Sequence, residues 1–247
     1  MRHFGLIGYP LGHSFSQRYF SAKFEREGIR DCTYHLFPIP SIDGFSGLWE
    51  TYPDLVGINV TIPYKEQVMM FLDHCSMVVA ESGACNCVKR TSAGLTGYNT
   101  DVVGFERTLE PGLQPWHERA LILGTGGAAK AVAYVLRRKG IGYRFVSRYP
   151  GGEDTLSYEM VDGGILSDHH LIINTTPLGM SPQVDAMPDL PYHLLGTRHY
   201  LFDLVYNPSE TAFLREGAAR GARVCNGADM LVIQAEESWR IWNDPEL

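Results

Sequence analysis

The chain has 247 residues, of which 45% are hydrophobic and 20% charged, and its formal net charge is −7 at pH 7. This acidic balance, with no block of basic residues, argues against a nucleic-acid partner or an anionic membrane surface, because basic patches bind both. The first residues lack the apolar core of a signal peptide, and no apolar run reaches the roughly 18 residues of a membrane span. We therefore expect a soluble cytoplasmic protein.

Five cysteines are scattered along the chain, and an odd number at irregular spacing is typical of reduced thiols rather than a disulfide framework. Cys85 and Cys87 lie close in sequence to His74 and Cys75, residue types that zinc sites also use. The spacing is not C-x₂-C, however, and alternating residues of a strand share one face. We therefore expect Cys85 and Cys87 on the same face of a strand, and no bound metal.

The first hundred residues alternate between strand and helix patterns. Strands are predicted at residues 4–8, 32–39 and 55–60. Apolar residues at helical spacing follow each of them: the first helix contains Phe20 and Phe24 and ends at Gly28, and the third contains Val68 and Leu72. This alternation predicts an α/β fold, in which ligand sites lie beyond the carboxyl ends of the strands.

Polar side chains gather where these strands end. Asn59, Thr61 and Lys65 lie at or just past the end of the third strand, which brings an amide, a hydroxyl and an ammonium group close together. Asn86 adds a second amide on what we expect to be a further strand near residues 83–88. Asp101 either caps the helix that follows it or pairs with Lys65.

Two serines follow the first strand, in the segment His13-Ser14-Phe15-Ser16. One interpretation is that Ser14 or Ser16 caps the helix that begins there, which would stabilise that helix by about 1 kcal/mol. The other is that both hydroxyls line a pocket beyond the end of the strand. The local sequence favours the cap.

The second half of the chain opens on a glycine-rich turn. Residues 110–118 predict a linker, and the strand at 120–123 then runs into Gly124-Thr125-Gly126-Gly127-Ala128-Ala129 and an alanine-rich helix. This order is what a dinucleotide fingerprint needs: Gly124 makes the tight turn, Gly126 lets the backbone approach a pyrophosphate, and Ala129 lets helix and strand pack closely. The phosphates would bind N–H groups at the start of the helix. The alternative is an ordinary strand-to-helix turn.

The end of the next strand, predicted at 143–147, indicates which dinucleotide is bound. An NAD site would place Asp or Glu there to bind the ribose 2′-hydroxyl. This chain has Ser147-Arg148 instead, and an arginine suits a 2′-phosphate, so NADP is the favoured cofactor. Further strands are predicted at residues 170–173 and 200–204, and we expect the terminal helix that follows Asn226-Gly227 to return to the first domain.

Together these motifs resemble the shikimate dehydrogenase family over nearly the whole chain. The Asn-Val-Thr-x-Pro-x-Lys and Asn-Thr-Asp pieces are the specific ones. The matching pieces, in chain order, are Gly8-Tyr9-Pro10, His13-Ser14-Phe15-Ser16, Asn59-Val60-Thr61-Ile62-Pro63-Tyr64-Lys65-Glu66, Gly83-Ala84-Cys85-Asn86, Asn99-Thr100-Asp101, Gly124-Thr125-Gly126-Gly127-Ala128, Ile173-Asn174-Thr175-Thr176-Pro177 and Met230-Leu231 with Gln234-Ala235.

The resemblance implies an α/β protein of two domains: residues 1–109 plus 228–247 as the substrate-binding and catalytic domain, and residues 110–227 as a Rossmann-like NADP-binding domain. It also implies that Lys65 and Asp101 form the catalytic pair. By the same resemblance, the substrate is bound by Ser14, Ser16, Thr61, Asn86 and Gln234, with Tyr206 at the cleft. NADP is bound by Gly124, Thr125, Gly126, Gly127, Ala128, Ser147, Arg148 and Thr175, with Gly227 near the nicotinamide.

The implied activity is the reversible, NADPH-dependent reduction of 3-dehydroshikimate to shikimate in chorismate biosynthesis, by a cytoplasmic monomer or homodimer. The chain departs from the usual family pattern at Cys87, where threonine often follows the asparagine, and at Ser147 and Tyr149, which flank Arg148 where asparagine and threonine are typical. Two alternatives stay open: a quinate/shikimate dehydrogenase that also uses NAD, and a non-catalytic dinucleotide-binding redox sensor.

Overall fold

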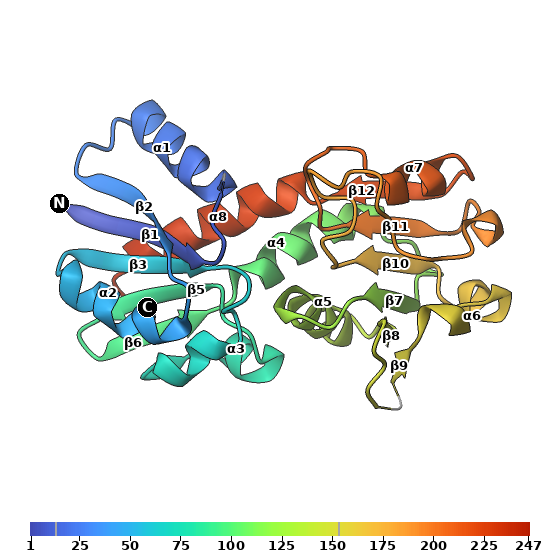
Figure 1. The fold of residues 1–247 in the computed structure, drawn as a ribbon, viewed down its shortest axis with the longest axis horizontal. Helices are drawn as coiled ribbons and strands as arrows, with labels where there is room; N and C mark the ends of the chain where they lie inside the picture. Colours follow the sequence, from blue (N-terminus) through green and yellow to red (C-terminus); the bar gives the residue numbers. More distant parts are fainter. Residues whose placement is uncertain (13, 153) are drawn as a thin grey trace. The chain divides into compact units, whose positions relative to one another are not determined.

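The computed structural model describes residues 1–12, 14–152 and 154–247, so His13 and Glu153 lie outside the described residues. The chain divides into two compact units, Met1–Thr100 with Gln234–Leu247, and Asp101–Ile233. Within the described residues each unit contains a six-stranded sheet flanked by helices (Figure 1). The predicted α/β class with two domains is confirmed, and so is the return of the C-terminal helix to the first unit.

The sheet of the first unit is mixed, with the strand order β2-β1-β3-β5-β6-β4. β1 is parallel to both β2 and β3, whereas β5 is antiparallel to β3 and β6, and β4 is parallel to β6. The strands are β1 (Arg2–Gly8), β2 (Cys32–Pro38), β3 (Leu55–Val60), β4 (His74–Cys75), β5 (Cys87–Thr91) and β6 (Gly94–Tyr98). Because β1 and β3 run parallel, the loops that follow them leave the same edge of the sheet.

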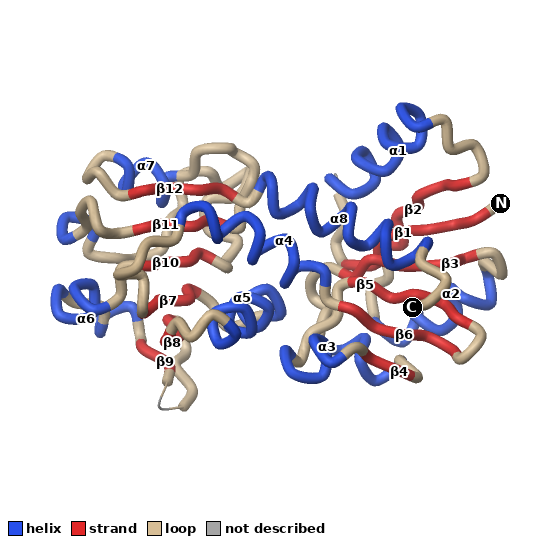
Figure 2. Tube along the Cα trace, turned by 180° about the vertical axis from the view of Figure 1, so that it is seen from behind, coloured by secondary structure: helices blue, strands red, loops and turns tan. Residues whose placement is uncertain are grey.

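Helices cover both faces of this sheet. They are α1 (Phe15–Glu27), α2 (Phe45–Thr51), α3 (Met77–Ser82) and the second part of α8 (Ala228–Asn243). Alternation along β1 sends Phe4 into a core with α1 and Trp242 of α8, and Ile7 into a second core with Phe45 of α2. Figure 2 shows these layers from behind.

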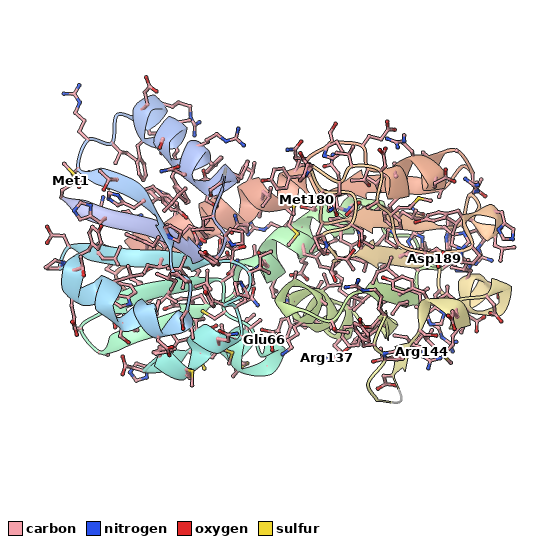
Figure 3. The ribbon with its side chains drawn as sticks, in the orientation of Figure 1. Met1, Glu66, Arg137, Arg144, Met180 and Asp189 are labelled. Atoms are coloured by element: carbon pink, nitrogen blue, oxygen red, sulfur yellow. The ribbon has the colours of Figure 1, made fainter. Side chains whose placement is uncertain are left out.

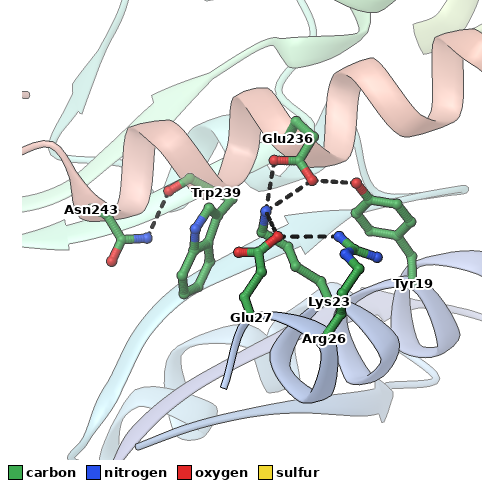
Figure 4. Close-up of polar contacts among 7 residues, drawn as sticks. All are labelled: Tyr19, Lys23, Arg26, Glu27, Glu236, Trp239 and Asn243. Atoms are coloured by element: carbon green, nitrogen blue, oxygen red, sulfur yellow. Dashed lines mark hydrogen bonds and ion pairs between the residues drawn. The ribbon is translucent and has the colours of Figure 1, made fainter. Parts of the chain in front are cut away.

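An ion-pair cluster fixes α8 to α1 within the first unit (Figure 4). The ammonium group of Lys23 lies 2.9 Å from the carboxylate of Glu236 and 3.0 Å from that of Glu27, and the Tyr19 hydroxyl donates to Glu236. Lys23 is only 5% exposed, so its charge needs these partners. α8 is thereby held by polar contacts as well as by the packing of Trp242.

The second unit has a wholly parallel sheet, with the order β12-β11-β10-β7-β8-β9. Its strands are β7 (Arg119–Leu123), β8 (Gly142–Val146), β9 (Thr155–Leu156), β10 (Leu171–Asn174), β11 (Tyr200–Asp203) and β12 (Arg223–Asn226). Numbered from β7, the order is 3-2-1-4-5-6, the doubly wound order of dinucleotide-binding folds, whose strand order reverses between β7 and β10.

The helices of the second unit are α4 (Thr100–Leu109), α5 (Gly127–Arg138), α6 (Gly163–Asp168), α7 (Ala212–Ala218) and the start of α8. Among these, α5, α6 and α7 connect the strands, α4 precedes β7 and α8 follows β12. Single 3-10 turns lie at η1 (Ile42–Gly44), η2 (Gln67–Phe71), η3 (Glu110–Gly112), η4 (Tyr158–Met160) and η5 (Tyr192–Leu194). None of the helices in the described part of the chain combines the length and apolar character that crossing a bilayer takes.

Two local predictions were wrong. The helix expected around Val68 and Leu72 is only the 3-10 turn η2, because Val68 is the one buried residue in it and no side chain caps its start. Cys85 and Cys87 also do not share a face: Cys85 packs in the core of Ile7, and Cys87 in that of Phe4. The reason is that β5 begins only at Cys87, so the two-residue period of a strand does not extend back to Cys85.

Candidate active site

In the first unit, the loops after β1 and β3 are joined at their start. The Thr61 N–H donates to the Ile7 carbonyl at 3.0 Å, and the Tyr9 N–H donates to the Ile62 carbonyl at 3.2 Å. A Cβ added at Gly8 would lie 2.5 Å from Thr61 Cγ2, so the two loops can approach this closely only because residue 8 is glycine. The chain that leads to Ser14 therefore starts beside Thr61.

The two serines have different partners. Ser14 Oγ accepts the Gln17 N–H at 3.4 Å and caps α1, which confirms the capping interpretation for Ser14. Ser16 hydrogen-bonds to the hydroxyl of Tyr34, a buried residue whose pKa is raised by that burial. Tyr34 in turn donates to Asn59 Oδ1 at 2.8 Å. Ser16 thus connects to a buried polar network, while the Ser14 hydroxyl still has its own proton to donate.

Lys65 follows β3 on a turn whose backbone is held at both ends. The preceding Tyr64 is 3% exposed, and its hydroxyl donates to the Ile39 carbonyl at 2.7 Å. The Lys65 carbonyl accepts the Cys85 N–H at 2.8 Å. The side chain of Lys65 is half-buried, and Figure 3 labels its neighbour Glu66. The backbone of Lys65 is therefore held against the segment that leads into β5.

Asn86 is buried and fastens the start of α4. Its Oδ1 accepts the Thr100 N–H at 2.7 Å, and its Nδ2 lies 3.0 Å from Thr100 Oγ1. The Asn86 carbonyl also accepts the Val60 N–H at 2.8 Å, so this residue links β3 to the helix start. Asp101 follows Thr100 directly, in the first turn of α4, where the helix dipole favours a carboxylate.

Gln234 reaches the same group of residues from α8. It is 7% exposed, and its Oε1 lies 3.5 Å from Thr100 Oγ1. One turn later, Ser238 lies 3.1 Å from Thr100 Oγ1 and accepts from Asn59 Nδ2 at 2.9 Å. The structure therefore brings Asn86, Thr100 and Gln234 together and connects them to Ser16 through Asn59.

Three members of this network were not predicted as site residues. Thr100 is the middle residue of the Asn-Thr-Asp motif, and the sequence could have identified it. Ser238 lies four residues after Gln234, on the same face of a helix, so its position was predictable as well. Tyr34 had none, because only the pairing of β1 with β2 and β3 brings it to Asn59.

In the second unit, the glycine turn has the conformation that a dinucleotide site needs. Gly124 has φ +104, a value that L-residues with a side chain rarely adopt. Gly126 precedes α5 without any side-chain cap, and a Cβ there would meet nothing within 4 Å. The first helical hydrogen bond runs from the Lys130 N–H to the Gly126 carbonyl, so the N–H groups of Gly127 and Ala128 have no acceptor within the helix. These features fit the phosphates of a bound dinucleotide.

Thr175 and Gly227 have structural partners at the same edge of the sheet. The Thr175 hydroxyl and N–H both donate to the Leu123 carbonyl, at 2.6 and 3.0 Å. Gly227 packs against the backbone of Leu204, where a Cβ would clash with the Leu204 carbonyl. Both residues lie just past the carboxyl ends of strands, Thr175 after β10 and Gly227 after β12.

The residues expected near the adenosine 2′-position follow β8. Ser147 is anchored by its N–H to the Leu156 carbonyl at 2.9 Å, and its Oγ accepts the Tyr149 N–H at 3.2 Å. Arg148 is exposed, and its guanidinium carbon lies 5.9 Å from the Tyr149 ring centre. The positive charge is therefore presented to solvent beyond the β8 end. Tyr206 is half-buried after β11.

Comparisons with known proteins give the family. Residues 6–88 match the family model described as the shikimate dehydrogenase substrate binding domain. A shikimate dehydrogenase (NADP(+)) from Caldicellulosiruptor saccharolyticus is 37% identical, over 99% of this chain and 93% of its own length. The chain belongs to the shikimate dehydrogenase family. The resemblance stated from the motifs is thus confirmed.

Two solved members of the shikimate dehydrogenase family have the same fold. Shikimate dehydrogenase 1 from Peptoclostridium difficile is 35% identical with a TM-score of 0.87, covering 100% of this chain and 93% of that one. The shikimate 5-dehydrogenase from Thermus thermophilus, solved in complex with NADP(H) and shikimate, is 32% identical with a TM-score of 0.85, covering 100% and 96%.

Proposed function

We infer that this chain is an NADP-dependent shikimate dehydrogenase, an oxidoreductase that reversibly reduces 3-dehydroshikimate to shikimate in chorismate biosynthesis. The inference rests on one observation: a shikimate dehydrogenase (NADP(+)) matches 99% of the chain. The match therefore includes both units, the one that contains the polar network and the one that contains the parallel sheet.

The substrate is assigned to the first unit by its chemistry. Shikimate carries one carboxylate and several hydroxyls, and neutral hydroxyl and amide side chains bind such groups as donors and acceptors. Ser14, Ser16, Thr61, Asn86 and Gln234 supply these groups, and all five belong to one compact unit. Tyr206, from the second unit, is assigned to the substrate as well.

Lys65 and Asp101 are assigned as the catalytic pair. NADPH supplies the hydride to the carbonyl carbon of 3-dehydroshikimate, which leaves the protein one proton to manage. Lys65 donates that proton to the emerging alkoxide, and accepts it again in the reverse direction. Asp101 orients the Lys65 ammonium group and the substrate hydroxyls. Acid–base steps of this kind accelerate a reaction by about 10²–10⁴-fold.

The cofactor is assigned to the second unit. The turn from Gly124 through Thr125, Gly126 and Gly127 to Ala128 would hold the pyrophosphate with its N–H groups. Ser147 and Arg148 would hold the 2′-phosphate, because a guanidinium group forms charge-assisted hydrogen bonds to phosphate oxygens. Thr175 and Gly227 lie at the strand ends on the nicotinamide side. We assign residues 1–109 with 228–247 to the substrate domain and residues 110–227 to the NADP domain. The protein would act in the cytoplasm as a monomer or homodimer.

A spectrophotometric assay tests this function. Purified protein is mixed with shikimate or quinate and with NADP or NAD, and the absorbance of the reduced cofactor is followed. We expect the highest kcat/KM with shikimate and NADP. Equal kcat/KM with quinate and NAD would instead identify a quinate/shikimate dehydrogenase. Cofactor binding with no turnover of either acid would indicate a dinucleotide-binding redox sensor.

A further inference from the structure

A serine on α8 lies at the centre of the polar network in the first unit but has no direct access to a ligand. Ser238 is 0% exposed, and its hydroxyl contacts Asn59, Thr100, the Gln234 carbonyl and the thiol of Cys87. We propose that Ser238 is a positioning residue for substrate binding, which sets the direction of the hydrogen bonds around Thr100 and so keeps the Asn86 amide available to shikimate. This proposal rests on the function inferred above.

The Ser238 hydroxyl has a single proton. Ser238 Oγ donates to the Gln234 carbonyl at 2.9 Å, which uses that proton. It accepts from Asn59 Nδ2 at 2.9 Å, and Thr100 Oγ1 lies 3.1 Å away. A hydroxyl has one donor and two acceptor positions. The geometry alone allows either hydroxyl to donate in the contact between Thr100 and Ser238. Because a carbonyl can only accept, we assign the Ser238 proton to the Gln234 carbonyl and the Thr100 proton to Ser238.

The direction of the hydrogen bond between Thr100 and Ser238 determines the direction of the one between Thr100 and Asn86. Because the Thr100 proton points to Ser238, Thr100 Oγ1 can only accept from Asn86 Nδ2, at 3.0 Å. Asn86 Oδ1 then accepts the Thr100 N–H at 2.7 Å. One proton of Nδ2 and one lone pair of Oδ1 are not consumed by Thr100, and these are the groups that a substrate hydroxyl can use.

Removal of the Ser238 hydroxyl reverses this arrangement. The Thr100 proton loses its acceptor, and the next acceptors are Asn86 Oδ1 at 3.2 Å and Gln234 Oε1 at 3.5 Å. Thr100 then competes with the substrate for one of the two amide oxygens. Asn59 Nδ2 also loses its partner, although it retains the Asn86 carbonyl at 3.3 Å.

The test is steady-state kinetics on the full-length enzyme with Ser238→Ala. We expect the KM for shikimate to rise about tenfold, as for the loss of one hydrogen bond of ordinary strength. The KM for NADP and the kcat should stay within twofold of the parent, because Ser238 contacts Asn59, Thr100 and Gln234, none of which is assigned to hydride or proton transfer. In a Thr100→Val background, which lacks the competing proton, Ser238→Ala should add no further rise in KM.

Ser82→Ala is the matched control. Ser82 is a buried serine of the same unit whose hydroxyl donates to the Ala84 carbonyl and contacts Asn99, not Asn86. It should leave the KM for shikimate unchanged. If Ser238→Ala fails to fold, Ser238→Cys tests the same loss, because a thiol is a weak hydrogen-bond acceptor, whereas Ser238→Thr keeps a hydroxyl and should retain the parent KM. The proposal is overturned if Ser238→Ala keeps the parent KM, or if Ser82→Ala raises it equally. A parent enzyme without shikimate-dependent NADP reduction would refute the proposed function instead.

Discussion

Gly124 and Thr175, the first residues after β7 and β10, are in close contact: a Cβ added at Gly124 would lie 2.8 Å from Thr175 Oγ1. The Thr175 hydroxyl cannot turn away without losing its hydrogen bond to the Leu123 carbonyl at 2.6 Å. Position 124 also has φ +104. Gly124→Ala should therefore lower the free energy of unfolding by about 1–3 kcal/mol, as measured by urea denaturation.

Gly126→Ala is the contrasting variant in the same turn. Its φ is −78° and a Cβ there meets nothing within 4 Å, so the stability should equal that of the parent or exceed it by a few tenths of a kcal/mol. The added methyl group would lie where the pyrophosphate is proposed to bind, so the KM for NADP should rise. Unchanged affinity for NADP would place the phosphates elsewhere.

Lys65→Ala should lower kcat by about 10²–10⁴-fold, with a smaller change in the KM for shikimate, because the variant loses the proposed proton donor. The measurement is the initial rate at saturating shikimate and NADP. Glu66→Gln, a change at the exposed neighbouring residue, should retain near-parent kcat. Near-normal turnover of Lys65→Ala would show that another group moves the proton.

Arg148→Ala should erase the preference for NADP over NAD. Charge-assisted hydrogen bonds to a phosphate contribute about 1.5–3 kcal/mol, so kcat/KM for NADP should fall roughly 10–100-fold while that for NAD stays the same. Arg148 is exposed, and the thermal stability should not change. Arg137→Ala, at an exposed arginine late in α5, controls for the loss of a positive charge. Equal losses with both cofactors would contradict the 2′-phosphate assignment.

Asp203 should make stability depend on pH. It is 0% exposed, and burial raises its pKa to about 6, although Thr211, Val205 and Asn174 all donate to it. The folded state thus holds the proton more tightly than the unfolded state, where an aspartate has a pKa of about 3.9. This contribution to stability is fully present below pH ~4 and is lost as the pH rises through ~6.

Asp203→Asn cannot titrate, so it isolates this effect. The difference in free energy of unfolding, parent minus variant, should fall by about 2 kcal/mol between pH 4 and pH 7, since one pKa unit corresponds to about 1.4 kcal/mol and the unfolded carboxyl is already half ionised at pH 4. Denaturant titrations at several pH values give this difference. Parallel curves for the two proteins would mean that the pKa of Asp203 is not raised.

Local features of the structure could be predicted from the sequence because residues close together in the chain determine them. The strand, glycine turn and helix around Gly124 follow from apolar runs and from the freedom of glycine at positive φ, and the cap at Ser14 follows from a hydroxyl placed just before a helical pattern. The family motifs were readable for the same reason, since each is a short run of residues. The sequence by itself thus determined the fold class and the family.

Only the tertiary structure decided which distant side chains meet. Asn59 and Ser238 are 179 residues apart yet hydrogen-bond at 2.9 Å, and Tyr34 reaches Asn59 only because β1 pairs with both β2 and β3. The opposite faces of Cys85 and Cys87 were decided in the same way, by the residue at which β5 starts pairing. A hydrogen bond requires its two atoms within about 3 Å, and strand register and helix packing, which local patterns do not specify, determine that distance.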